Sequence, residues 1–480
     1  MRRLPAELTC SIFELLCFAD RITATHVCKG WRQVAIDHGQ LWSRIKCRSV
    51  AALATLIARA RCVPVDLEVF GIADRTLEAI LELVAAHLDH IRLLSLRAGD
   101  ARLSLERVPG VYKAFKCAAP LLEVVDVQLF DCPFPEPNRI AMLEARIARF
   151  SCLVPEDLFS GQAPRLHQIS FRTMVLDPPS AVAAFSNLVR VEFDADFLSE
   201  EEILAIVSLP RLRCLHLEVM EYDVPPMPAP QGFRLDELWL GNQGSTPLFN
   251  PICSLLRYLG FPHIRHFTSD WDELWLETIT ASPRSLPHTL IVEGWSTGGH
   301  FWGAEAWKML HDGNFVTELV DVHSGTDISW TDEQHLLANV RELTVLYYDL
   351  RMAYYEDDFE FSELERLCVR VSAADCLRDD WPDDDRIPCP KLRTIELWGG
   401  IDDSTVTMRA VDLAAFLTAF LDHDTYSPPD LVLRDVEIVQ PIGSRVDLEE
   451  LVLSVQRHEG DAPDPFTVEL KSKWHASVQD

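Results

Sequence analysis

One spacing of apolar residues dominates this chain: an apolar residue, two residues, an apolar residue, one residue, and a third apolar residue. Alternate residues of a strand point to the same face, so each such triad predicts a short strand whose apolar side chains enter a shared core. The triads are Ile91/Leu94/Leu96, Leu122/Val125/Val127, Leu166/Ile169/Phe171, Leu188/Val191/Phe193, Leu212/Leu215/Leu217, Leu235/Leu238/Leu240, Val340/Leu343/Val345, Leu364/Leu367/Val369, Leu392/Ile395/Leu397, Leu433/Val436/Ile438 and Leu448/Leu451/Leu453. From Leu166 to Leu235 their first positions are 22, 24 and 23 residues apart, which is the period of leucine-rich repeats.

Several segments between the triads have helical spacing. Ser199–Glu202 and Thr331–Gln334 read as capping boxes that begin helices, and Val411–Leu421 is an amphipathic helix. Helix and strand in alternation predict an α/β solenoid in which each unit stacks on its neighbours. Residues 264–325 fit the repeat poorly, so a less regular stacked α/β sheet is the alternative.

The segment before the first triad also has a clear periodicity. Ala51–Ala60 and Ala73–Leu88 have helical spacing, and Val63–Phe70 is extended and apolar. We therefore expect residues 49–90 to form a helical linker or capping region, with the repeat body at 91–460 and a tail at 461–480.

Residues 4–46 carry a shorter-range pattern that predicts three helical pieces. Pro5 suits a first helical turn, Asp20 can cap a second helix, and Gly39 can stop the last run. Such a small segment is near the lower size limit for independent stability. Leu4, Pro5, Phe13 and Trp42 look like surplus apolar surface, which requires a partner or packing on the rest of the chain.

The order of residues in this segment resembles the F-box motif. The matching residues are Leu4, Pro5, Glu7, Leu8, Ile12, Phe13, Leu16, Asp20, Val27, Cys28, Lys29, Trp31, Arg32, Ala35, Leu41 and Trp42. One departure is Arg21-Ile22, where many relatives have a leucine directly after the aspartate. The resemblance implies that residues 1–48 dock the Skp-type adaptor of a cullin-containing SCF ubiquitin ligase. The implied adaptor-contacting residues are Leu4, Pro5, Leu8, Ile12, Phe13, Leu16, Val27, Cys28, Trp31 and Trp42. The body resembles the irregular leucine-rich-repeat domains that often follow an F-box.

Composition and charge limit the alternatives. Of the 480 residues, 48% are hydrophobic, which is enough for a sizeable core, and no apolar run is long enough for a membrane span. The thirteen cysteines include no C-x-x-C pair, and the start of the sequence has no hydrophobic signal segment. We therefore expect reduced thiols and a cytoplasmic or nuclear location. The net charge of the whole chain is −30. Because residues 1–48 carry +4, the rest of the chain carries −34, so nucleic acid is not an expected partner.

The sequence offers weak candidates for catalysis or metal binding. Gly294–Gly298 matches the G-x-S-x-G nucleophile elbow around Ser296, and Gly303–His311 reads as a following helix, but a glycine-rich turn between repeats is the favoured interpretation. His263 and His266 lack further metal ligands and read as a partly buried strand pair. With no nucleotide-binding loop in the sequence, we expect a protein that is not an enzyme and has no cofactor or metal.

Tryptophan is concentrated between residues 271 and 330. Because tryptophan is enriched at binding hot spots, Trp271, Trp275, Trp295 and Trp302 are candidate target contacts, although core filling is the simpler explanation. The leading interpretation is a substrate receptor of an SCF ligase that holds an unidentified protein target, with a basic protein as one candidate because the body is acidic. A repeat scaffold that docks the adaptor without delivering a substrate is the second, and a hydrolase using Ser296 the third.

Overall fold

The computed structural model describes residues 4–99, 103, 105–130, 154–172, 182–226, 229–241, 249–270, 289–294, 305–311, 315–322, 338–346, 361–371, 389–399, 406–420, 428–439, 452 and 454–458. The chain divides into two compact units, residues 1–264 and 265–480. Among the described residues, no helix has both the length and the apolar character needed to cross a bilayer.

The first unit is built on parallel strands that pair in chain order. They are β1 (Arg44–Cys47), β2 (Val65–Ile72), β3 (Ile91–Ala98), β4 (Val124–Gln128), β5 (Gln168–Arg172), β6 (Arg190–Leu198), β7 (Cys214–Tyr222) and β8 (Glu237–Gly241). Parallel pairing of consecutive strands requires a crossover connection between them.

The predicted triads explain this register. All three residues of each triad from Ile91 to Leu240 are buried, and the second and third lie in register across neighbouring strands; Leu94, for example, pairs with Val125, which pairs with Ile169. The strand predictions in this unit are therefore confirmed. The residues between the buried positions of each strand are mostly polar, so the sheet has one apolar and one polar face.

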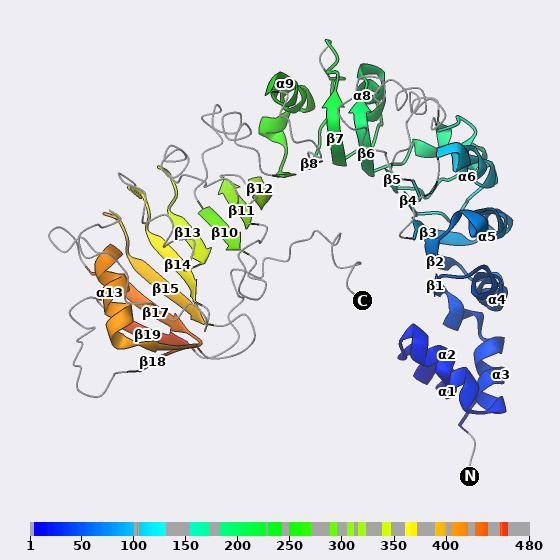
Figure 1. Ribbon diagram of the computed structural model, residues 1–480, viewed down its shortest axis with the longest axis horizontal. Helices are drawn as coiled ribbons and strands as arrows, with labels where there is room; N and C mark the ends of the chain where they lie inside the picture. The colour runs from blue at the N-terminus through cyan, green and yellow to red at the C-terminus, as the bar shows by residue number, and fades with distance from the viewer. Residues whose placement is uncertain are drawn as a thin grey trace. The chain divides into compact units, whose positions relative to one another are not determined.

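Helices cover the apolar face (Figure 1). They are α4 (Val50–Ala60), α5 (Asp74–His87), α6 (Val108–Ala114) and α8 (Glu200–Val207), with α9 (Phe249–Leu259) after β8. Short 3-10 turns complete the unit: η1 (Gly39–Trp42), η2 (Leu105–Arg107), η3 (Leu158–Gly161), η5 (Ala183–Phe185) and η6 (Phe261–His263). The capping box predicted at Ser199 is confirmed, because the Ser199 Oγ accepts from the Glu202 N–H and the Glu202 carboxylate accepts from the Ser199 N–H.

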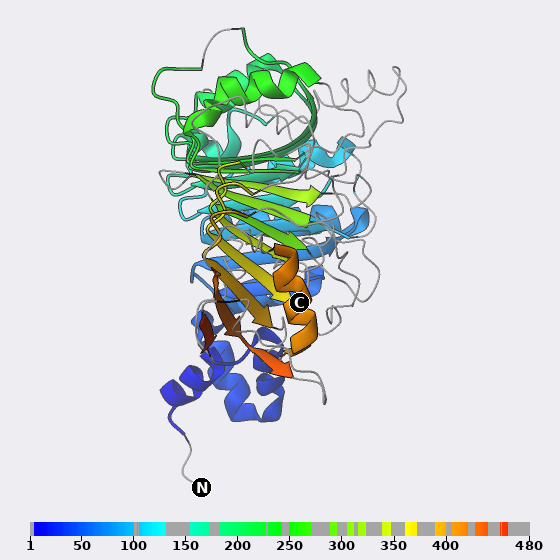
Figure 2. The same cartoon turned by 90° about the vertical axis from the view of Figure 1, so that its left-hand side faces the viewer.

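The start of the sheet differs from the sequence prediction. Strand pairing begins at β1, inside the segment that resembles an F-box, and residues 49–90 supply α4, β2 and α5 as further members of the same alternation. Beyond β1 lie α1 (Ala6–Glu14), α2 (Phe18–Val27) and α3 (Lys29–Asp37), seen at the end of this sheet in Figure 2. No structural break separates residues 49–90 from the strand that begins at Ile91.

The second unit combines parallel and antiparallel pairing. Its strands are β9 (His266–Asp270), β10 (Thr289–Gly294), β11 (Glu305–His311), β12 (Phe315–Val322), β13 (Glu342–Leu346), β14 (Arg366–Val371), β15 (Thr394–Gly399), β16 (Val406–Arg409), β17 (Asp430–Arg434), β18 (Val436–Val439) and β19 (Ser454–His458). β11 runs antiparallel to β10 and β12, whereas β10, β13, β14, β15, β17 and β19 pair in parallel in that order. β9 pairs in parallel with β12, and β16 with β18 in a separate two-stranded sheet.

The predictions for this unit have mixed outcomes. The triads at Val340, Leu364 and Leu392 are buried as expected, and α13 (Ala410–Phe420) confirms the helix predicted from Val411. The triad at Leu433 is wrong, because Asp435 has a left-handed backbone (φ 53°) that separates β17 from β18. The residues in register with the neighbouring triad are Leu431 and Leu433. The triad at Leu448 and the helix predicted after Thr331 lie outside the described residues.

The helix predicted over Gly303–His311 is also wrong. Residues 305–311 form β11, which pairs with β10 from Thr289 to Gly294 in an antiparallel ladder. A nucleophile elbow needs a strand followed by a helix. Because two antiparallel strands flank residues 295–304, the described geometry lacks that arrangement around Ser296.

Candidate docking surface of the N-terminal module

The three predicted helices of the N-terminal module are present as α1, α2 and α3. Cysteine thiols cap two of them: the Cys17 Sγ accepts from the Asp20 N–H and the Cys28 Sγ from the Trp31 N–H, both at 3.4 Å. The prediction that Asp20 caps the second helix is therefore wrong by one turn. Asp20 lies inside the first turn of α2, where its negative charge still suits the helix dipole.

Large aromatic side chains hold the three helices together. Phe13 and Trp42 have no exposed surface, and the Trp42 indole N–H donates to the Ala35 carbonyl at 2.8 Å. The Phe13 ring meets Trp31 edge-on, with centroids 5.4 Å apart. Of the two outcomes expected for Phe13 and Trp42, a partner or packing on the rest of the chain, the structure shows packing within the chain, which buries both. Neither side chain can touch a partner in this conformation.

Arg21 ties the end of α1 to the turn η1. Its guanidinium donates to three backbone carbonyls, those of Phe13, Leu16 and Leu41. The last carbonyls of a helix have no partner within it, and a cation there is also favoured by the helix dipole. Burial lowers the pKa of Arg21 from its ordinary value. The departure from leucine at this position therefore has a structural role.

The module continues directly into the first sheet. A Cβ atom added to Gly39 would come within 2.7 Å of the Ala60 carbonyl oxygen at the end of α4, so only glycine fits at this contact. The Asp66 N–H donates to the Ser43 carbonyl at 2.7 Å, and the Arg59 guanidinium lies 4.8 Å from the centroid of the Trp42 ring. These contacts join η1 and the residue after it to α4 and β2.

An apolar stripe remains exposed along α1. Its residues are Leu4, Leu8, Ile12 and Leu15, with exposed fractions of 56%, 53%, 43% and 88%. At about 100° per residue, Leu8, Ile12 and Leu15 fall within one sector of the helix, and Leu4 lies just before the N-cap residue Pro5. Thr9, Cys10 and Phe13, which face the module core, lie on the opposite side. Val27, at the end of α2, is a further exposed apolar residue of the module, at 61%.

The other residues implied as adaptor contacts lie at intermediate positions. Pro5 is exposed at the start of α1, and Leu16 and Trp31 are half-buried. Cys28 is exposed, although its thiol serves as the cap of α3. Leu15 was not expected at the surface of this site. The available signal was its spacing of seven residues from Leu8, which places both on one side of a helix.

Comparison with known families identifies this segment. The F-box-like family model matches residues 1–48. Residues 1–48 are an F-box-like domain. A domain of this type implies binding of a Skp-type adaptor, and the match covers about a tenth of the chain. No curated protein matches the chain.

The remaining sequence-predicted sites are not brought together by the described part of the structure. Trp271, Trp275, Trp295, Trp302 and Ser296 lie outside the described residues. His263 is exposed in η6, and His266 is half-buried at the start of β9, so only one of the expected strand pair is in a strand. Within the described ranges, no group of three or more His, Cys, Asp or Glu side chains is placed to hold a metal ion.

Proposed function

We propose that this chain is a substrate-receptor subunit of an SCF-type ubiquitin ligase. The F-box-like domain docks the adaptor, which links it to the cullin, and the two sheet units hold a protein target. The observation that carries the proposal is the exposed stripe of Leu4, Leu8, Ile12 and Leu15 on a domain whose largest aromatic side chains, Phe13 and Trp42, are fully buried. This chain performs no chemistry of its own, and ubiquitin is transferred by other subunits.

The stripe has the properties of a docking surface. Full burial of a leucine or isoleucine contributes about 1.5–3 kcal/mol, so covering the exposed half of each side chain contributes about 1 kcal/mol or more. Leu8, Ile12 and Leu15 on one side of α1, together with Leu4 just before it, supply several kcal/mol of association free energy, before the cost of immobilising two molecules. A row of apolar residues without a partner is unfavourable in water, which supports permanent or frequent occupation of this face.

The strand order of the first unit supports a leucine-rich-repeat-like body. In the first unit β1 to β8 pair in parallel in chain order, and one helix-covered face receives the buried triads. Because the core occupies one face only, the polar face of the sheet is available for a partner. We therefore assign target binding to the body and adaptor binding to the F-box-like domain.

The test separates the two roles by point substitutions. The tagged full chain and its Leu8→Glu/Ile12→Glu variant are purified from cells after proteasome inhibition, with Val189→Glu, an exposed valine outside the module, as the control. We expect the double variant to lose adaptor and cullin and to retain body-bound proteins, which are then no longer ubiquitinated.

Two outcomes contradict the proposal. Retention of the adaptor by the double variant removes the docking assignment. Adaptor loss with unchanged ubiquitination of every bound protein favours a scaffold that docks the adaptor without delivering a substrate.

A further inference from the structure

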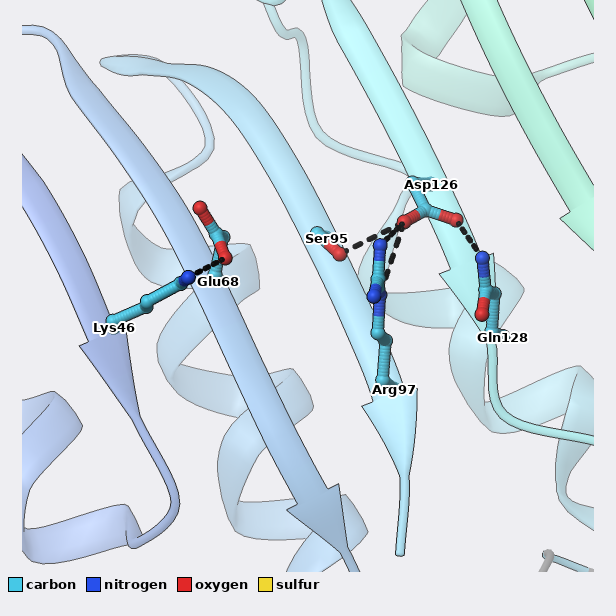
Figure 3. Close-up of polar contacts among 6 residues, drawn as sticks. All are labelled: Lys46, Glu68, Ser95, Arg97, Asp126 and Gln128. Carbon is cyan, nitrogen blue, oxygen red and sulfur yellow. Dashed lines mark hydrogen bonds and ion pairs between the residues drawn. The ribbon is translucent and has the colours of Figure 1, made fainter. Parts of the chain in front are cut away.

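The polar face of the first sheet carries one continuous row of side chains in register. It follows the pairing from β1 to β8 and comprises Lys46, Glu68, Ser95, Asp126, Ser170, Glu192, His216 and Trp239, here called the polar row. Figure 3 shows its first half, in which Lys46 points to Glu68 and Asp126 is surrounded by Ser95, Arg97 and Gln128. This half is satisfied internally, with the Lys46–Glu68 pair at 3.4 Å and hydrogen bonds of 2.9–3.1 Å from Ser95 Oγ, Arg97 Nη2 and Gln128 Nε2 to the Asp126 carboxylate.

Glu192, in the second half of the row, has an unsatisfied hydrogen-bond acceptor. Its side chain is only 6% exposed, yet its Oε1 atom has no hydrogen-bond partner among the described residues. A buried carboxyl oxygen without a partner carries a desolvation cost that a bound donor would relieve. The nearby cations already have partners, since Arg97 pairs with Asp126 and Arg190 pairs with Glu237 at 2.7 Å.

A flat aromatic pair lies beside Glu192 in the same row. The rings of His216 and Trp239 stack with centroids 3.6 Å apart and planes 27° from parallel. His216 is the register partner of Glu192, and both rings are only half-buried. A planar guanidinium can lie on such a surface while its N–H groups reach a carboxyl oxygen, which an ammonium cannot match in shape.

We propose that Glu192, His216 and Trp239 form a binding site for an arginine side chain of a protein target. The Glu192 Oε1 accepts from the guanidinium, and the aromatic pair supports its plane. The proposal rests on the proposed function, because it names the kind of residue by which the body recognises its target. A net charge of −34 outside residues 1–48 attracts basic segments to the body in general, and the site selects arginine among them.

The protonation state of Glu192 gives a second measurable property of the site, the release of a proton on binding. Burial raises the pKa of this carboxyl to about 8, with the negative charges of Asp126 and Glu237 acting in the same direction and Ser170 and Arg190 opposing it. On the neighbouring strand β7, His216 is the register partner of Glu192, and the titratable residues Cys214 and Glu218 lie two positions to either side of His216. A bound guanidinium favours the ionised carboxylate, so binding releases a proton from Glu192 to the buffer near pH 7.

The experiment measures binding of a defined probe to the full chain. The probe is a fluorescein-labelled nine-residue Gly/Ser peptide with one central Arg, and matched peptides carry Lys or citrulline. Fluorescence polarisation at physiological salt is expected to give affinity for the Arg peptide at least about ten-fold above that for citrulline. Glu192→Gln should reduce this preference to below about three-fold, and Trp239→Leu should remove the preference of Arg over Lys.

The matched control is Glu68→Gln, an acid of the same row that is paired with Lys46. It should leave the preference unchanged. The proposal is overturned if the Arg and citrulline peptides bind equally, if Glu192→Gln keeps the preference, or if Glu68→Gln removes it equally. Adaptor binding by the same variants is read separately, and its presence or absence judges the proposed function alone.

Discussion

Arg21 stands where many F-box relatives have a leucine, and its guanidinium holds the end of α1 and the turn η1 together by hydrogen bonds. A guanidinium that donates to the Phe13, Leu16 and Leu41 carbonyls connects α1, the following loop and η1. Arg21→Met keeps the length of the side chain and removes its donors. We expect the free energy of unfolding to fall by about 1–2 kcal/mol, because the carbonyls lose charge-assisted hydrogen bonds and only water can replace them. Urea denaturation measures this, and unchanged stability would show that the three bonds contribute nothing.

Glu192 makes a prediction about pH. Its pKa is raised from 4.5 to about 8 on folding, so the folded state holds a proton that the unfolded state releases. The resulting stabilisation is complete below pH 4.5 and is lost as the pH rises through 8. Glu192→Gln, which resembles the protonated form, should therefore have a shallower decline of Tm between pH 6 and 9 and be more stable than the wild type above pH 8. Parallel Tm curves for the two proteins would contradict the raised pKa.

At the scale of elements, the spacing of apolar residues predicted most strands, because burial of those residues determines where the strands form. In the triads from Ile91 to Leu240 the second and third residues share one face of a strand and the first is also buried, and nothing local opposes that arrangement. The predicted elements are wrong where strand pairing or backbone conformation, and not burial, determines the structure. β11 has apolar residues at helical spacing but is fixed by its ladder with β10. The triad at Leu433 is divided by the left-handed backbone of Asp435, which a spacing rule does not register.

The cap of α8 is a second test at this scale. The Ser199 N–H donates to the Glu202 carboxylate at 2.7 Å, and the Glu202 N–H donates to the Ser199 Oγ at 3.3 Å. Ser199→Ala removes one of these bonds and should lower the free energy of unfolding by about 0.5–2 kcal/mol. Ser11→Ala, at an exposed position within α1, is the control and should change stability by less than about 0.5 kcal/mol. Equal effects of the two substitutions would argue against the capping box as a stabilising feature.

At the scale of the whole molecule, the motif predicted the kind of module but not its attachment or its packing. The spacing of Phe13 and Trp42 cannot tell which side of a helix meets its neighbours, so the sequence leaves a partner and packing within the chain both open. The structure shows that both side chains are part of the core. Gly39 against Ala60 and β1 against β2 make the module part of the first sheet. Deletion of residues 1–46 would therefore uncover β2, and point substitutions are the proper test of docking.

The division into two compact units leads to a prediction for a truncated chain. Residues 1–264 contain the F-box-like domain, the sheet from β1 to β8 and the helices α4, α5, α6 and α8 that cover it. Because the buried triads of this sheet lie within the same residues, a chain ending at Ile264 should fold cooperatively and bind the adaptor as the full chain does. Circular dichroism with thermal unfolding and adaptor titration measure this. Aggregation or loss of adaptor binding would show that the first unit depends on residues beyond 264.

The central claim, that the exposed stripe of α1 docks the adaptor, is tested most directly by calorimetric titration of a purified Skp-type adaptor into the full chain. Leu8→Glu with Ile12→Glu should weaken binding by about 100-fold, since each substitution removes apolar burial worth about 1.4 kcal/mol or more. Both side chains are half exposed, so the Tm of the variant should remain close to that of the wild type. Val189→Glu should bind the adaptor within about two-fold of the wild type. An unchanged Kd for the folded double variant would contradict the account.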